Sequence, residues 1–249
     1  MRAGVALAVF VKTPGLSPVK TRLAEGLGRE RAEEFYHLSV AAVEATVAAA
    51  AARNDIAAYW AVAEEAGLAN ARWQRFPRIH QGSSELGERL GRVFEQLQRR
   101  HDAVIAIGGD SPQITPELIG RACRVWEGDA SAEPGQTLAL GPAGASPSLL
   151  GRCHDGGFYL VGTNRPLPSA VWRDVPYSTF DAASQLAAKL TRHGPIVELR
   201  PLADVDRAAD LTVLRDELRA IADPSAEQLA VLKWIDANDE SRMTNDEAR

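Results

Sequence analysis

Short apolar runs along the chain predict buried strands. Val5–Val11 and Ile56–Val62 are almost unbroken apolar stretches, and a third run lies in DAVIAIGGDSP at residues 102–112. Runs of this length without polar alternation are typical of strands buried on both faces of a parallel sheet. Shorter strands are predicted for RIHQ from residue 78, TLALG from 137, GGFYLVG from 156 and PIVEL from 195.

Between these runs, apolar residues recur at helical spacings. Residues 30–53 predict a long alanine-rich helix, and a second helix opens at Ser84 and ends among arginines, where cations suit the negative end of the helix dipole. Thr115 followed by Pro116 has the chemistry of a helix start. Further helices are predicted within residues 174–194 and 204–221, and a loop at residues 128–135.

The alternation of strands and helices predicts an α/β fold, a doubly wound, Rossmann-like three-layer sandwich with a mostly parallel central sheet. We expect one domain over residues 1–237 and a frayed, disordered tail at 238–249, which has almost nothing to bury. Ligands of such folds collect at the carboxyl ends of the strands. Asp155 precedes its strand, so it reaches this edge only if the chain folds back.

Composition excludes several classes of protein. The 249 residues carry a formal net charge of -5 at pH 7 and no long basic run, which argues against sequence-independent nucleic-acid binding. Cys123 and Cys153 have neither the number for a disulfide framework nor the spacing of a zinc site, so we expect reduced thiols and a cytoplasmic protein. No segment is interpreted as a signal peptide or a membrane span.

One cationic loop stands out against this acidic background. VFVKTPGLSPVKTRL, at residues 9–23, places Lys12, Lys20 and Arg22 around prolines and a glycine. Such a loop can aim backbone N–H groups at phosphate oxygens, while lysine supplies a point charge and arginine a planar fork. The Walker and GxGxxG patterns are absent. Three solvated surface cations are the alternative, but the position after the first strand favours phosphate.

Asp110, in IGGDSP, is a candidate metal ligand. It ends an apolar strand after two glycines that permit close backbone approach, so it could hold a divalent ion that bridges phosphate oxygens. A capping role before the next helix is the alternative. A serine esterase with Ser111 as nucleophile is disfavoured, because the D-x-x-H pattern that would supply its base occurs nowhere in the chain.

Three later aspartates are further candidates. Asp155, in HDGGFYLVG, and the pair Asp204 and Asp206, in LADVDRAADL, would complete a metal site or face a substrate hydroxyl. A turn role for Asp155 and helix capping for the pair are the alternatives. The five histidines show no ligand or triad spacing. Trp172 is a candidate for stacking on a base or sugar.

Taken in order, VFVKTPGLSPVKTRL, QGSSELGERL, IGGDSP, DGGFYLVG and DVDRAADL resemble a bacterial glycosyltransferase-like family of the nucleotide-diphospho-sugar transferase superfamily, with members labelled arsenosugar-biosynthesis-type glycosyltransferases. The resemblance covers about residues 3–218 and implies a GT-A-like fold, a nucleotide bound over the first loop, and a Mg or Mn ion. One departure is an insertion, GASPSLLGRCH at residues 144–154, for which we expect a lid or a narrowing of the acceptor pocket.

The resemblance also implies a role for each matching residue. Asp110 and Asp206 would bind the metal, and Asp155 and Asp110 would be catalytic. The other expected contacts are Lys12, Thr13, Lys20, Arg22 and Gly109 for nucleotide or phosphate, and Gly156 and Gly157 for substrate.

These expectations predict a metal-dependent glycosyltransferase that moves a sugar from a nucleoside-diphosphate sugar to a hydroxyl of a small acceptor, with Asp155 as candidate base. The alternative is a nucleotidyltransferase that uses an NTP and releases pyrophosphate. The opening segment also resembles phospholactate guanylyltransferases, although the GxGxR opening of common sugar nucleotidyltransferases is absent. A nucleotide-binding protein without turnover is a third class. The expected partners are the nucleotide and a small acceptor, with no nucleic acid.

Overall fold

The computed structural model describes residues 4–127, 137–138, 144–177 and 179–247. Its strands form a single mixed sheet in the order β3-β2-β1-β4-β7-β6-β8-β5. The strands are β1 (Val5–Val11), β2 (Ile56–Val62), β3 (Arg78–His80), β4 (Ala103–Gly108), β5 (Thr137–Leu138), β6 (Ser148–Cys153), β7 (Phe158–Thr163) and β8 (Ile196–Leu202).

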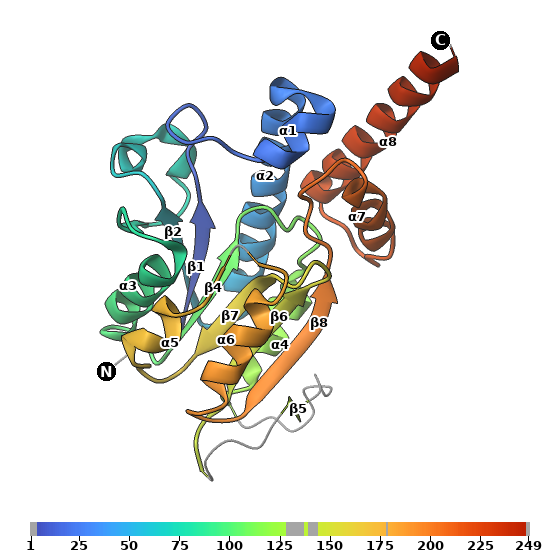
Figure 1. The fold of residues 1–249 in the computed structure, drawn as a ribbon. Coiled ribbons are helices and arrows are strands. Elements are labelled where there is room, and N and C mark those ends of the chain that lie inside the picture. The colour runs from blue at the N-terminus through green and yellow to red at the C-terminus, as the bar shows by residue number, and fades with distance from the viewer. Residues whose placement is uncertain (1–3, 128–136, 139–143, 178, 248–249) are drawn as a thin grey trace.

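Helices cover both faces of this sheet, as Figure 1 shows. They are α1 (Thr21–Leu27), α2 (Arg29–Arg53), α3 (Leu86–Gln98), α4 (Pro116–Arg124), α5 (Ser169–Arg173), α6 (Ala182–Leu190), α7 (Asp210–Arg219) and α8 (Ala226–Glu247), with two short 3-10 turns, η1 (Ala66–Ala69) and η2 (Ala71–Trp73).

The direction of each strand brings most strand ends to one edge of the sheet. β1 is parallel to β2 and β4, and β2 is parallel to β3. β7 is antiparallel to both β4 and β6, so β6 runs the same way as β4, and β8 is parallel to β6. The β6–β7 hairpin therefore turns at the carboxyl edge. This is the fold-back that Asp155 requires.

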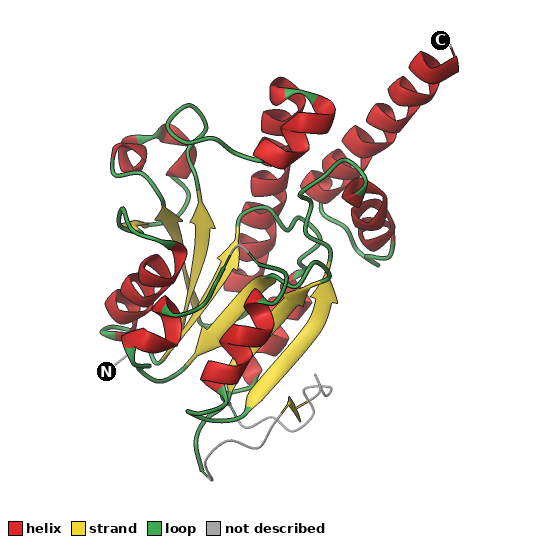
Figure 2. Cartoon of the chain, viewed as in Figure 1, coloured by secondary structure: helices red, strands yellow, loops and turns green. Residues whose placement is uncertain are grey.

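Figure 2 shows helices on both sides of the sheet, and the side chains of β1 alternate between these two layers. Leu7 and Val9 pack in one buried cluster with apolar residues of α2 and α4, while Ala6 and Ala8 belong to a second cluster with α3, α5 and α6. Both faces of the strand are dry, which explains its unbroken apolar sequence. The predicted doubly wound three-layer sandwich is confirmed.

A third apolar cluster joins α1 and α2 to α7 and α8. The rings of Phe35 and Trp234 are 5.4 Å apart, and Leu214 and Ile235 are fully buried in the same cluster. α8 continues as helix through Glu247, past the point where the sequence predicts a tail. The single domain over residues 1–237 and its disordered tail stay predictions.

α2 is long and apolar enough to cross a membrane by length and composition, and half of its most apolar window is buried. The buried side includes Val40, Val43 and Val47, which pack in the first core cluster. Core helices pass the same test, so the packing of α2 accounts for its apolar composition.

The strands predicted at Val5–Val11 and Ile56–Val62 have the observed bounds, and the helix predicted at residues 30–53 begins one residue earlier. The predicted loop at 128–135 and residues 139–141 of the predicted strand from 137 lie outside the described residues. The prediction that residues 144–154 form a lid is wrong for most of that segment. Residues 148–153 form β6, whose Leu149 and Leu150 are completely buried within the sheet, and only His154 at its end lines the pocket described below.

Replacing Thr115 tests the start of α4. Its side chain accepts a hydrogen bond from the N–H of Leu118 at 3.3 Å, and Pro116 follows at the first helical position. Thr115→Ala should lower the free energy of unfolding by about 1 kcal/mol, measured by urea denaturation. Thr212→Ala, at an exposed position inside α7, is the matched control and should change stability little. Equal effects of the two substitutions would contradict the capping assignment.

Candidate functional site

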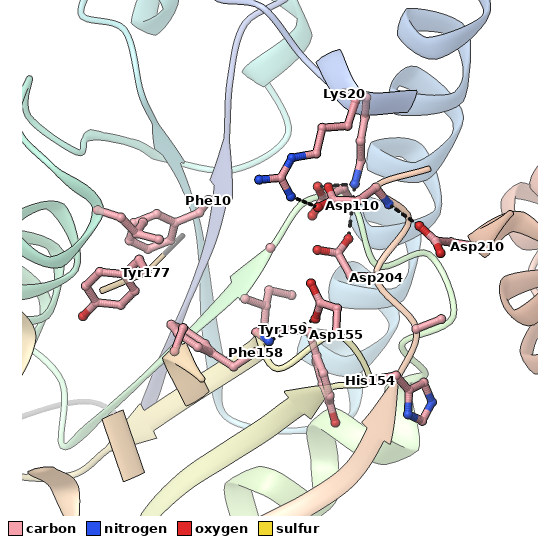
Figure 3. Close-up of a pocket in the computed structure, with 18 of the residues that line it drawn as sticks. Phe10, Lys20, Asp110, His154, Asp155, Phe158, Tyr159, Tyr177, Asp204 and Asp210 are labelled. Atoms are coloured by element: carbon pink, nitrogen blue, oxygen red, sulfur yellow. Dashed lines mark hydrogen bonds and ion pairs between the residues drawn. The ribbon is translucent and has the colours of Figure 1, made fainter. Parts of the chain in front are cut away.

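A cavity of about 1290 Å³ opens at the carboxyl edge of the sheet. Its lining comes from the ends of β1 and β4, from the segments that follow β1, β4, β6 and β8, and from β7, α3 and the segment before α6. β1 and β4 are neighbours at which the strand order reverses, which is where ligands bind in doubly wound folds. Figure 3 shows aspartates gathered at one end and the aromatic rings of Phe10, Phe158 and Tyr177 at the other.

Lys20 lies at the centre of the acidic end. Its side chain is only 5% exposed, and its ammonium lies 2.8 Å from Oδ2 of Asp110 and 3.3 Å from Oδ1 of Asp204. It also donates a hydrogen bond to the carbonyl of Val205 at 2.9 Å. An ammonium has three N–H donors, so these contacts use all of them. Lys20 is therefore a fixed internal cation in this structure, and its predicted contact with phosphate stays a prediction.

The backbone at Lys20 is held in the left-handed region, with φ 44°. Among the described residues it is the one non-glycine residue with positive φ. That conformation costs about 1–2 kcal/mol. The three contacts of the ammonium compensate this cost and fix the loop's entry into α1.

The electrostatics of this cluster leave negative charge in excess. Burial by itself would lower the pKa of Lys20, but Asp110 and Asp204 outweigh it and raise that pKa. Burial works in the opposite direction on Asp110, and Lys20 overcomes it, so the pKa of Asp110 is lowered. Asp204 has the opposite outcome: burial, together with Asp110, Asp206 and Asp155, outweighs Lys20 and raises its pKa to about 6.

Three carboxylates converge beside this lysine. Asp155, Asp204 and Asp206 each offer an oxygen, and the three oxygens lie within 4.8 Å of one another. We call these residues the acidic triad. Clustered carboxylate oxygens are the hard ligands that Mg²⁺ and Mn²⁺ prefer. The sequence predicts Asp110 and Asp206 as ligands, and the structure brings Asp206 together with Asp155 and Asp204. Asp110 lines the same cavity and is paired with Lys20, and its role as a metal ligand stays a prediction.

A tight turn carries Asp155 into the triad. Its Oδ1 accepts a hydrogen bond from the N–H of Gly157 at 3.0 Å, and Gly156 has φ 93°. A Cβ on Gly156 would lie 1.5 Å from the carbonyl oxygen of Phe180, so only glycine fits there. Asp155 therefore shapes its turn and also faces the site. Gly157 lines the cavity, whereas Gly156 supports the turn.

The segment between β8 and α7 places the other two members. Asp210, in the first turn of α7, accepts hydrogen bonds from the N–H groups of Asp206 at 3.0 Å and Arg207 at 2.6 Å. Asp210 thus accepts the backbone N–H groups near the start of α7. From the sequence, this capping role is the alternative for Asp204 or Asp206. Both of those side chains face the cavity instead.

The remaining cations of the first loop lie at the cavity. Lys12 is exposed and lines the cavity. Its backbone N–H donates to the Tyr36 hydroxyl at 2.9 Å, and that hydroxyl donates to the carbonyl of Lys12, also at 2.9 Å. Arg22 is 55% exposed and pairs through Nη1 with Asp206. These two side chains, unlike Lys20, present donors to the open part of the cavity.

Two predicted nucleotide contacts are structural. Thr13 is 1% exposed, its hydroxyl accepts from Nε1 of Trp73 at 3.0 Å, and its N–H donates to Glu64 at 2.9 Å. Gly109 donates its N–H to the carbonyl of Phe10 at 3.0 Å, and a Cβ there would lie 2.7 Å from Val11. Both residues fix the end of β1, and neither lines the cavity.

Two further candidates from the sequence are also buried. Ser111 is 4% exposed, which removes it as an esterase nucleophile. Trp172 is 2% exposed, and its ring lies 4.6 Å from that of Phe94, so it packs in the core and does not stack on a ligand.

The aromatic end of the cavity is absent from the predictions. Phe158 and Tyr177 have ring centroids 6.0 Å apart, and Phe180, which is 83% exposed, lines the same cavity. The signals in the sequence are Phe158, which follows Asp155 in DGGFYLVG, and Tyr177 and Phe180, which directly precede a predicted helix. Such rings suit planar or apolar parts of a ligand.

Asp204→Asn should stabilise the metal-free protein above pH 6. Because folding raises the pKa of this carboxyl from 3.8 to about 6, the protonated group favours the folded state below pH 4, and this contribution is lost as the pH rises through 6. The amide carries no charge to neutralise and still accepts from Lys20. We expect a gain in unfolding free energy on the order of 1–2 kcal/mol at pH 8 that disappears near pH 4.

Chemical denaturation with EDTA present, at both pH values, measures this difference. Asp174→Asn, at an exposed carboxylate outside the cavity, is the control. A stability difference for Asp204→Asn that does not change with pH would contradict the electrostatic explanation.

Solved structures share this fold. A "putative nucleotide-diphospho-sugar transferase" from Desulfovibrio desulfuricans G20 superposes with a TM-score of 0.74 at 22% identity, covering 94% of this chain and 95% of the other. This likeness confirms the GT-A-like fold. Two more distant likenesses are 4-diphosphocytidyl-2C-methyl-D-erythritol synthase from Anaerococcus prevotii DSM 20548 (TM-score 0.49, 10% identity, 94% and 99% covered) and Rv0371c with manganese from Mycobacterium tuberculosis H37Rv (0.47, 13%, 86% and 98%).

No protein of curated function matches the sequence. A family match does exist, and it spans residues 40–179, which include the end of β4 with Asp110 and the turn with Asp155. Since this match covers more than half of the chain, the protein belongs to the bacterial family described as "Uncharacterized protein conserved in bacteria (DUF2064)".

Proposed function

We propose that the protein is a divalent-cation-dependent glycosyltransferase that moves a sugar from a nucleoside-diphosphate sugar to a hydroxyl of a small acceptor. The observation that carries the proposal is the acidic triad, placed beside Lys12 and Arg22 in a large cavity at the point where the strand order reverses. Assignment to the arsenosugar-biosynthesis-type group and a cytoplasmic location belong to the same proposal.

The residues fit a Mg²⁺ or Mn²⁺ ion. Asp155, Asp204 and Asp206 would hold it, since their oxygens converge within 4.8 Å. Burial, together with the charges of Asp110, Asp206 and Asp155, raises the pKa of Asp204 despite Lys20. When bound, a divalent ion would screen this charge and polarise the oxygens of a diphosphate. Without such a cation, the same carboxylates would repel the diphosphate.

The cationic side chains stabilise the leaving group in this proposal. Transfer of the sugar breaks its bond to the diphosphate, and negative charge develops on the phosphate oxygens. Lys12 reaches the open cavity, and the guanidinium of Arg22 has donors beyond the nitrogen that binds Asp206. Lys20 contributes indirectly to the site, because it fixes Asp110 and Asp204 at the edge of the sheet.

The acceptor hydroxyl must lose a proton when the new glycosidic bond forms. Asp155 is the most exposed member of the triad and stays the candidate base. Phe180 and Tyr177 supply a surface on which a planar part of the nucleotide or an apolar part of the acceptor can stack.

Nucleotidyl transfer is the second candidate. In-line attack on the α-phosphate of an NTP needs the same features: cations around the phosphates and carboxylates that hold a metal. The triad and the first loop would serve that reaction equally well. The difference is the product, because nucleotidyl transfer releases pyrophosphate and glycosyl transfer releases a nucleoside diphosphate.

Thermal shift with a panel of NTPs, NDPs and NDP-sugars, with and without Mn²⁺, separates the candidates. A ligand at a hundred times its dissociation constant should add about 2.7 kcal/mol of stability. We expect the largest shift with an NDP-sugar and Mn²⁺ together, followed by release of the nucleoside diphosphate when an acceptor is added. Preference for an NTP with release of pyrophosphate would instead establish nucleotidyl transfer. No thermal shift with any member of the panel would contradict both activities.

Asp155→Asn tests the triad directly. The amide can still accept the hydrogen bond from Gly157 and so keeps the turn, but it removes one charged ligand. Turnover should fall about a hundredfold, equivalent to about 3 kcal/mol of barrier. Binding of Mn²⁺, measured by electron paramagnetic resonance, should weaken in parallel. Asp174→Asn, exposed and outside the cavity, should change neither quantity; unaltered Mn²⁺ binding in Asp155→Asn would refute the ligand assignment.

A further inference from the structure

One carboxylate near the site has no role in the proposed function. Glu217 lies in the last half of α7, and its side chain is 15% exposed. Both of its oxygens lie 3.1 Å from the N–H of Ala203, which donates to them. Oε2 also accepts from Nε2 of Gln113 at 2.9 Å, and Oε1 lies 3.3 Å from Nε2 of His154.

Each of these three partners belongs to a different loop of the site. Ala203 precedes Asp204, and His154 precedes Asp155. Gln113 belongs to the segment after β4 that carries Asp110, and it donates a second hydrogen bond to the carbonyl of Ala203 at 2.7 Å. One side chain from a helix outside the sheet therefore joins the segments that follow β4, β6 and β8.

The chemistry of these contacts requires a carboxylate. Ala203 offers a backbone N–H and Gln113 an amide N–H, and both point at Glu217. A carboxylate is the side chain that only accepts, with two oxygens that can serve several donors. A glutamine of the same size would keep one accepting oxygen and turn an NH₂ group toward these donors. The neighbour Asp216 is 70% exposed on the same helix, so position on α7 alone does not require an acid.

We infer that Glu217 is a positioning residue that holds the segments of Asp155 and Asp204 at the spacing that a divalent ion needs. The inference rests on the proposed metal site. Residues that orient metal ligands without touching the ion affect affinity strongly, because the ligand oxygens must be held within a fraction of an ångström.

The experiment compares the Mn²⁺ affinity of wild type, Glu217→Gln and Asp216→Asn, measured by electron paramagnetic resonance on the full chain. Asp216→Asn makes the same chemical change one residue away and should bind Mn²⁺ as wild type does. Glu217→Gln should bind about tenfold more weakly while it stays folded at the assay temperature. Affinity within twofold of wild type would overturn the inference, and so would a lower melting temperature with unchanged affinity, because a purely structural role predicts that result.

A second variant decides the question if Glu217→Gln does not fold. His154→Ala removes a side chain that is 52% exposed and frees only the β6–β7 turn from Glu217. Its Mn²⁺ affinity should also fall, and an affinity within twofold of wild type would overturn the inference. If wild type itself does not bind Mn²⁺, the proposed metal site is refuted, and this inference is refuted with it because it depends on that site. If wild type binds and both variants bind equally well, the inference alone fails.

Discussion

The buried ammonium of Lys20 is the interaction on which the site depends. It bonds Asp110, Asp204 and the backbone of Val205, and so ties the first loop to the segments after β4 and β8. Removal of the ammonium itself would leave the buried carboxylates of Asp110 and Asp204 uncompensated, which typically costs about 3–5 kcal/mol. One lysine nevertheless faces more carboxylates than it can neutralise. In the proposed function, a bound divalent cation would relieve this imbalance.

The imbalance also implies a conflict between stability and binding. Asp204 is held where its ionised form is unfavourable, with a pKa raised to about 6. Binding sites commonly keep such destabilised groups, because a bound ligand relieves the cost and is bound more tightly for it. In the proposal, Glu217 meets a second requirement of a metal site. Converging carboxylates can share an ion only if the segments that carry them are held at a fixed spacing.

Strand topology determines which residues can meet. β7 runs against its neighbours, so the turn between β6 and β7 lies at the same edge as the ends of β1, β4 and β8. Asp155 joins the triad for this reason, although it precedes its strand. The segment interpreted as an inserted lid supplies β6 itself and is essential to this arrangement.

The sequence by itself determined the strands and helices whose patterns are local. The unbroken apolar run Val5–Val11, the helix at residues 30–53 and the Thr115–Pro116 helix start depend on neighbours in the chain, so periodicity and capping chemistry predict them. Only the tertiary structure decided which charges are free. Lys20 and Asp110 are bonded to each other, and Thr13 is buried under Trp73. The acidic triad and Glu217 are assembled from residues far apart in the chain, because long-range burial and hydrogen bonding have no signature in local sequence.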